Sequence, residues 1–208
     1  MSFKGRAFIV LPALSLCLAA ALATDARAQS KQTMQDDAIG RARGDAEVAT
    51  RQLTNLDALV RQRAAEELAR IKATDRRRLV EGYRLQEKND RVRLALDWAL
   101  YRLGKPEALY AVVRALSSSR YNQAQAYLSE LESPEPLYLF LARSEGVTLA
   151  RLIETLARTG DATTLERIKP YADANDVKVA SAARFASREI TRRLDPSTSS
   201  AEAKAPPR

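Results

Sequence analysis

The side chains that most often carry out chemistry in proteins are scarce in this sequence. Histidine is absent, which removes the commonest general base and the commonest metal ligand. Cys17 is the only cysteine, so a Ser-His-Asp triad, a Cys-His pair and a thiolate zinc site all lack essential members. No glycine-rich phosphate loop is present. We therefore predict that the protein is not an enzyme and that it needs no cofactor and no metal.

Carboxylates are the remaining candidates for acid–base chemistry, and they cluster at two places. Glu66 and Glu67 are adjacent, and Glu130, Glu132 and Glu135 fall within a short stretch. Both clusters lie at predicted helix ends or on polar helix faces, where acidic residues are ordinarily solvated. We therefore interpret them as surface residues rather than as catalytic ones.

The basic residues outnumber the acidic ones, and the formal net charge is +8. A basic surface attracts nucleic acid or acidic lipid headgroups. Nucleic acid is not the expected partner, because the sequence also carries an export signal, described below. Contact with an anionic membrane surface stays open as an alternative.

The strongest candidate for a binding site is a group of apolar and aromatic residues on one predicted helix. In the helix predicted over residues 92–104, Leu94, Trp98 and Tyr101 lie opposite the apolar stripe. Arg102 borders them, and Arg70 holds the equivalent place one repeat earlier. Trp and Tyr supply a large contact area with few rotors, and Arg adds directional hydrogen bonds. We predict that this patch binds an extended or acidic protein segment; the alternative is that another helix of the chain covers it.

The helix that carries this patch is one of a series. Its apolar stripe begins at Val92, and the same pattern begins at Val60. Taking these valines as position zero, the series continues at Arg120, Thr148 and Val177, at intervals of 32, 28, 28 and 29 residues. Position plus eight is apolar in every unit: Leu68, Leu100, Leu128, Leu156 and Phe185. Near-constant spacing of this kind is typical of a helical repeat.

Shorter helices are predicted between the members of this series, over residues 75–87, 106–116, 134–143 and 161–171. The second and third of them open with Pro106 and Pro134 followed by glutamate, and both residue types favour the first turn of a helix. Each unit is thus a pair of helices about 30 residues long. One pair cannot bury both of its apolar faces, so neighbouring pairs must stack.

The repeated motif resembles that of a known family. The pattern D-x-x-V-R-x-x-x-A at Asp57, Val60, Arg61 and Ala64 is similar to the second helix of a HEAT-like repeat, and so is the pattern N-x-x-V-R-x-x-L-x-x-A-L-x-x-L-G over residues 89–104. The short interval resembles that of the HEAT-like repeats first associated with bilin lyases, which have an armadillo-type fold. The resemblance covers residues 55–194.

The resemblance implies an all-α fold, a right-handed α-solenoid of about five HEAT-like helix pairs, acting as a scaffold that binds proteins. It further implies that an Asp and an Arg link adjacent repeats, here as Asp57 with Arg61 and Asp90 with Arg93. Some members of the family are lyases or nucleic-acid enzymes. A lyase-type enzyme that uses tyrosines and carboxylates therefore remains the enzymatic alternative.

The first 28 residues have the pattern of an export signal. Lys4 and Arg6 precede an apolar run from residue 7 to residue 23, and the small residues Ala26 and Ala28 follow it. We predict a cleavable signal peptide, a mature start near Gln29, and a periplasmic or secreted protein. Retention of the segment as an N-terminal anchor is the alternative.

Four segments complete the predicted organisation. A signal peptide over 1–28 precedes a flexible lead-in over 29–44, the helical-repeat domain spans 45–194, and a disordered tail follows over 195–208. The tail is rich in Ser, Ala and Pro and has no apolar period. The whole pattern is that of an exported scaffold that mediates protein–protein interaction.

Overall fold

The computed structural model describes residues 40–195. The predicted signal peptide, most of the lead-in and nearly all of the tail lie outside the described residues. Within residues 40–195 the regular elements are all helical and no strand is present, so the prediction of an all-α fold is confirmed. The chain divides into two compact units, residues 1–47 and 48–208. The described part of the first unit is helical over residues 40–47.

The start of the first described helix differs from the prediction. We expected the flexible lead-in to extend to residue 44, but residues 40–44 are already helical, and the helix ends at residue 52. Arg41, Ala42 and Arg43 are strong helix formers, and no proline interrupts them. The lead-in therefore ends earlier than residue 44.

The helices of the second unit alternate as predicted. The long repeated helices are α2 (Ala58–Arg70), α4 (Asp90–Arg102), α6 (Tyr121–Ser129), α8 (Gly146–Thr159) and α10 (Val177–Leu194). The shorter helices between them are α3 (Arg77–Gln86), α5 (Leu109–Arg114), α7 (Glu135–Leu141) and α9 (Ala162–Ile168). Short 3-10 turns at Thr74–Arg76, Pro106–Ala108, Ala115–Ser117 and Lys169–Asp173 extend three of the shorter helices.

The helix boundaries follow from local sequence chemistry. The side chains of Asp57, Asn89 and Asp176 accept hydrogen bonds from the first backbone N–H groups of α2, α4 and α10, which are otherwise unpaired. Gly104 follows α4 with a φ of 89°, a left-handed conformation that glycine adopts without strain. Gly160 follows α8 for another reason: a Cβ there would lie 2.8 Å from Ile190 Cδ1, so only glycine lets α10 approach so closely.

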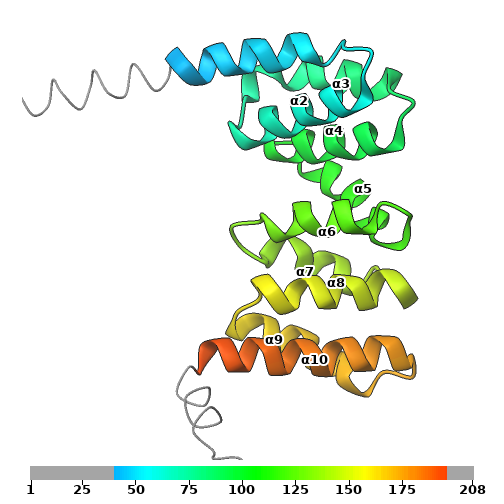
Figure 1. Ribbon diagram of the computed structural model, residues 1–208. Coiled ribbons are helices and arrows are strands. Elements are labelled where there is room, and N and C mark those ends of the chain that lie inside the picture. The colour runs from blue at the N-terminus through cyan, green and yellow to red at the C-terminus, as the bar shows by residue number, and fades with distance from the viewer. Residues whose placement is uncertain (1–39, 196–208) are drawn as a thin grey trace, which may run out of the picture. The chain divides into compact units, whose positions relative to one another are not determined.

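The long helices pack on one another in chain order. Helix α2 contacts α4, α4 contacts α6, α6 contacts α8, and α8 contacts α10. Figure 1 shows α6, α8 and α10 lying one below the next, with α7 and α9 beside them. The core between these helices is aliphatic, with fully buried side chains that include Leu68, Leu96, Leu128, Leu156 and Ile190.

The fifth unit is out of register with the prediction. Val177 and Phe185 were expected to be buried, but their exposed fractions are 80% and 44%. The buried stripe of α10 begins instead at Val179, three residues after its capping residue Asp176. This is the spacing of Asn89 to Val92 in α4, so position zero of the fifth unit is Val179.

The predicted link between repeats is made by a different acid. Asp57 caps α2, and Arg61 instead forms two hydrogen bonds, of 2.7 and 3.0 Å, with the carboxylate of Glu87, which lies just before α4. Arg93 lies 3.5 Å from Asp90 of its own helix. Arg61 therefore ties α2 to the next helix pair, whereas the ion pair of Arg93 with Asp90 stays within α4.

Candidate functional site

The predicted patch on α4 is not an exposed surface. Leu94 and Trp98 have exposed fractions of only 5% and 2%, and Tyr101 is half-buried. The reason is Tyr127 of α6, whose ring stacks on Trp98 at a centroid distance of 5.5 Å and an interplanar angle of 4°. The expectation that these side chains face outward is therefore wrong, and a neighbouring helix covers them.

The two predicted arginines have different surroundings. Arg102 lies over the Trp98 ring, with its guanidinium carbon 5.5 Å from the ring centroid. Arg70 is well exposed and pairs with Glu67 of its own helix. The structure thus joins Trp98, Tyr101 and Arg102 into one packed cluster, whereas Leu94 lines a separate cavity and Arg70 lies outside the cluster.

A network of hydrogen bonds links α6 to α2 in the same region. The Tyr127 hydroxyl donates to Glu66 Oε1 at 2.5 Å, and Gln62 Nε2 donates to the same oxygen at 2.8 Å. Gln123 Nε2 in turn donates to the Tyr127 hydroxyl at 2.7 Å. Burial, and then the hydrogen bond to Glu66, raise the pKa of Tyr127 far above its usual range. The phenol therefore remains protonated and acts as a fixed donor between α6 and α2.

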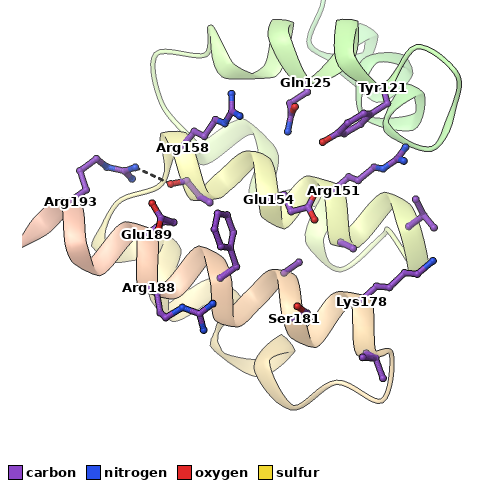
Figure 2. A pocket seen from close by; sticks show the side chains of 16 residues that line it. Tyr121, Gln125, Arg151, Glu154, Arg158, Lys178, Ser181, Arg188, Glu189 and Arg193 are labelled. Carbon is purple, nitrogen blue, oxygen red and sulfur yellow. Dashed lines mark hydrogen bonds between the residues drawn. The ribbon is translucent and has the colours of Figure 1, made fainter. Parts of the chain in front are cut away.

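An open groove lies elsewhere, along α6, α8 and α10. Its volume is about 1260 Å³, and Figure 2 shows its lining side chains. Helix α6 contributes Tyr121 and Gln125; α8 contributes Val147, Ala150, Arg151, Glu154, Ala157 and Arg158; and α10 contributes Val177, Lys178, Ser181, Ala182, Phe185, Arg188, Glu189 and Arg193.

Three of the six groove residues of α8 occupy the repeat positions that we assigned to the patch on α4. Ala150, Glu154 and Ala157 stand at positions plus two, plus six and plus nine, where α4 has Leu94, Trp98 and Tyr101. Two of the three are alanines, so their side chains leave open the space that the aromatic residues fill beside α4.

The same three repeat positions of α10 also line the groove once its register is corrected. Counting from Val179, positions plus two, plus six and plus nine are Ser181, Phe185 and Arg188, and all three line the groove. The sequence did hold a signal for this register, because Asp176 precedes Val179 by three residues, as Asp57 precedes Val60.

The groove is electropositive. Arg158, Lys178 and Arg188 are exposed, and their side chains make no hydrogen bond or ion pair within residues 40–195. Two acidic residues, Glu154 and Glu189, also line it, but Glu189 pairs with Arg192 at 2.5 Å. The unpaired cations therefore outnumber the unpaired carboxylates, which favours an anionic ligand.

Two further arginines are fixed in the groove wall. Arg151 donates to the carbonyl oxygen of Leu116 at 2.6 Å and lies 4.1 Å from the Tyr121 ring centroid. Arg193 donates to the carbonyl oxygens of Ala157, at 2.9 Å, and Gly160. These contacts tie the ends of the groove to backbone groups and give it a defined shape.

Apolar side chains are interleaved with these charges. Phe185 has an exposed fraction of 44%, and Val147 and Val177 are also exposed. In Figure 2 the side chains of Arg158, Glu189 and Arg188 lie toward the end of the groove at which Arg193 is drawn. A ligand in this groove would meet both apolar surface and positive charge.

Residues 40–195 contain no cluster of acidic residues suited to hold a metal ion. None of the helices over these residues combines the length and the apolar character needed to cross a bilayer.

No protein-family model matches the chain, and no curated protein matches it.

Proposed function

We propose that this protein is an exported, non-enzymatic scaffold of the HEAT-like type, a right-handed α-solenoid that binds an extended protein segment carrying acidic residues. The observation that carries the proposal is the groove along α6, α8 and α10, with its exposed Arg158, Lys178 and Arg188. The solenoid part of the proposal is supported by the pairwise packing of α2 through α10 in chain order.

An extended segment suits the groove because three successive long helices line it. Side chains that point away from a peptide backbone on one side would meet Phe185 and Val177, and carboxylates beside them would meet Arg158 and Arg188. Aromatic and Arg side chains are the residue types that contribute most to binding energy at interfaces. Long-range attraction by the basic side chains would speed association with an acidic partner.

A binding titration with designed peptides tests this proposal. We would measure fluorescence anisotropy with a labelled peptide that alternates Glu and Leu, and with a matched peptide that alternates Lys and Leu. The acidic peptide should bind and the basic one should not. Binding should weaken as the salt concentration rises, because exposed charges are screened.

Charge reversal locates the binding face. The double change Arg158→Glu and Arg188→Glu should weaken binding of the acidic peptide at least tenfold. The matched control is Arg77→Glu with Arg78→Glu, which changes the net charge equally on two exposed residues of α3. Equal losses in both variants would mean that only net charge matters and would contradict a site in the groove. Tight binding to anionic vesicles without peptide binding would favour the membrane alternative.

Export is tested separately. Intact-mass analysis of protein recovered from the periplasm or the medium should give a chain that begins at Gln29. A full-length chain in the cytosol would contradict the export part of the proposal and would leave the peptide-binding part standing.

A further inference from the structure

A second cavity, of about 480 Å³, lies where α3, α4 and α5 meet the loop before α6. It shares no lining residue with the groove. The cavity is lined by four basic residues, Arg84, Arg93, Arg114 and Arg120, and by two acidic residues, Asp90 and Asp97. Its polar lining is completed by Tyr110, Ser117, Ser118 and Ser119. Its volume falls in the range of about 300–1,000 Å³ that is usual for small-molecule sites.

The two carboxylates of the cavity are already matched by cations. Asp97 is nearly buried, with an exposed fraction of 8%, and accepts a 2.6 Å hydrogen bond from Arg84 Nε. Asp90 is exposed and has a single long contact of 3.5 Å with Arg93. Two arginines, Arg114 and Arg120, are left over, so the cavity has an excess of positive charge.

These remaining arginines lack partners within residues 40–195. Neither Arg114 nor Arg120 forms a side-chain hydrogen bond or an ion pair there, and the Nε atom of Arg120 is buried without a hydrogen-bond acceptor. Leaving a buried donor unpaired is unfavourable, and native structures rarely do so without a reason. An acceptor oxygen brought by a ligand would satisfy this group.

The serine loop provides a hydroxyl donor beside the arginines. The hydroxyls of Ser117 and Ser118 donate to the carbonyl oxygens of Arg114 and Ala115 at 3.0 and 2.8 Å, which fixes the start of the loop. The Ser119 hydroxyl has no such partner in the described chain, and its residue is exposed. It is therefore free to donate to a bound oxygen atom.

We propose that this cavity binds a phosphate or sulfate group of a small ligand, held by Arg114, Arg120 and the Ser119 hydroxyl. Guanidinium groups present paired N–H donors whose geometry matches the oxygens of phosphate and sulfate. Tyr110, with an exposed fraction of 59%, lies at the rim of the cavity and offers a ring face to the organic part of such a ligand. This site is independent of the groove and does not rest on the proposed peptide binding.

Calorimetric titration of the full chain with pyrophosphate tests the site. Pyrophosphate should bind with one-to-one stoichiometry, and the double change Arg114→Gln and Arg120→Gln should weaken it at least tenfold. The control pair Arg77→Gln and Arg78→Gln removes the same charge from α3 and should leave the affinity within a factor of two. No measurable binding at millimolar pyrophosphate, or equal losses in the two variants, would overturn the proposal.

A second variant guards against a folding defect in the first. Ser119→Glu places a carboxylate in the cavity from an exposed loop position, so it should also weaken pyrophosphate at least tenfold while circular dichroism stays unchanged. Retained affinity in a folded S119E protein would overturn the site.

Competition identifies the source of the oxyanion. If phosphatidylglycerol vesicles displace pyrophosphate, and the loss depends on Arg114 and Arg120, the site accepts a lipid headgroup. If pyrophosphate binding persists in the presence of the vesicles, the ligand is a soluble phosphate or sulfate ester. Displacement that is equally strong in the R114Q/R120Q and R77Q/R78Q variants would show general surface attraction and would count against the site.

Discussion

Helices α4 and α8 occupy equivalent places in their repeats, yet their faces toward the neighbouring long helices are built in opposite ways. Beside α4 the rings of Trp98, Tyr101 and Tyr127 stack and fill the space. Beside α8 the corresponding side chains of Ala150, Glu154 and Ala157 leave a groove. Large aromatic side chains fill the face of α4, whereas two of the three equivalent positions on α8 carry alanine and line a groove.

The two regions also differ in how neighbouring repeats are tied together. In the first region Arg61 pairs with the Glu87 carboxylate. In the second, Arg151 and Arg193 donate instead to the backbone carbonyl oxygens of Leu116 and Ala157. A carboxylate titrates and a carbonyl does not, so the contact in the first region should depend on pH and those in the second should not.

The largest effect should come from removing the ring at the centre of the filled region. Trp98→Ala deletes a side chain with an exposed fraction of 2% and should lower the free energy of unfolding by about 3–5 kcal/mol. Phe185→Ala in the open groove is the matched control and should cost about 1 kcal/mol or less, since Phe185 is 44% exposed. Urea denaturation measures both.

Fluorescence gives an independent check of the filled region. Trp98 is the only tryptophan, so its emission maximum should be blue-shifted and acrylamide should quench it weakly. If W98A and F185A cost the same free energy, or if Trp98 is readily quenched, the contrast between a filled and an open region is wrong.

Converting the open region into a filled one gives the next largest effect. The triple change Ala150→Leu, Glu154→Trp and Ala157→Tyr copies the α4 pattern into α8. It should block the groove and weaken binding of the acidic peptide at least tenfold, equivalent to about 1.4 kcal/mol or more. Circular dichroism checks that the variant stays helical, since Ala150 and Ala157 line the groove with exposed fractions of only 6% and 3%. Unchanged peptide binding in the folded variant would show that the groove is not the site.

Much of this arrangement could be predicted from the sequence, because helix starts and apolar periods are local signals. Asp57 and Asn89, of residue types that favour helix starts, cap α2 and α4, and Gly104 follows α4. Positions plus two, plus six and plus nine were predicted to face outward, and on α4 they are instead largely buried, with Trp98 stacked on Tyr127 of α6.

What the sequence did not reveal is which of those faces is covered. The sequence left open whether Trp98 is exposed or covered, because the pattern of α4 alone does not show that Tyr127 of α6 will stack on it. Coverage depends on contacts between residues far apart in the chain, which no local period encodes. Phe185 was missed for a different reason: the fifth unit was aligned on Val177, and its capping residue Asp176 would have placed it correctly.

The ion pair of Arg61 with Glu87, which links repeats in the first region, predicts a moderate, pH-dependent effect on stability. Glu87→Gln should lower the free energy of unfolding by about 1–2 kcal/mol at pH 7, because it removes the charge that Arg61 binds. The hydrogen bond from Arg61 is the main cause that holds the pKa of Glu87 below its usual 4.5. A carboxyl group whose pKa is lower in the folded than in the unfolded state stabilises the fold when the pH is above its unfolded-state pKa. This contribution is lost as the pH falls through the folded-state pKa.

The difference between the wild type and E87Q should therefore shrink as the pH is lowered below about 4.5. Arg151→Gln is the control, since its carbonyl acceptor at Leu116 does not titrate, and its cost should be similar at both ends of the range. Urea titrations at pH 7 and pH 3.5 measure both variants. A cost for E87Q that does not change with pH would contradict the assigned role of the carboxylate.

The smallest effects are expected at position plus ten, where the same residue type serves both regions. Arg102 lies over Trp98 and its side chain is only 15% exposed, so Arg102→Ala should cost about 1 kcal/mol through lost stacking and packing. Arg158 is exposed in the groove, so Arg158→Ala should change stability by no more than about 0.5 kcal/mol. Arg70, exposed and paired with Glu67 one turn away, should behave like Arg158 in stability.

Peptide binding should reverse the order: R158A should weaken the acidic peptide severalfold, and R102A should leave it unchanged because that residue lies outside the groove. Loss of peptide binding in an R102A protein of unchanged stability would mean that the binding surface lies on α4. The burial of Trp98 argues against that outcome.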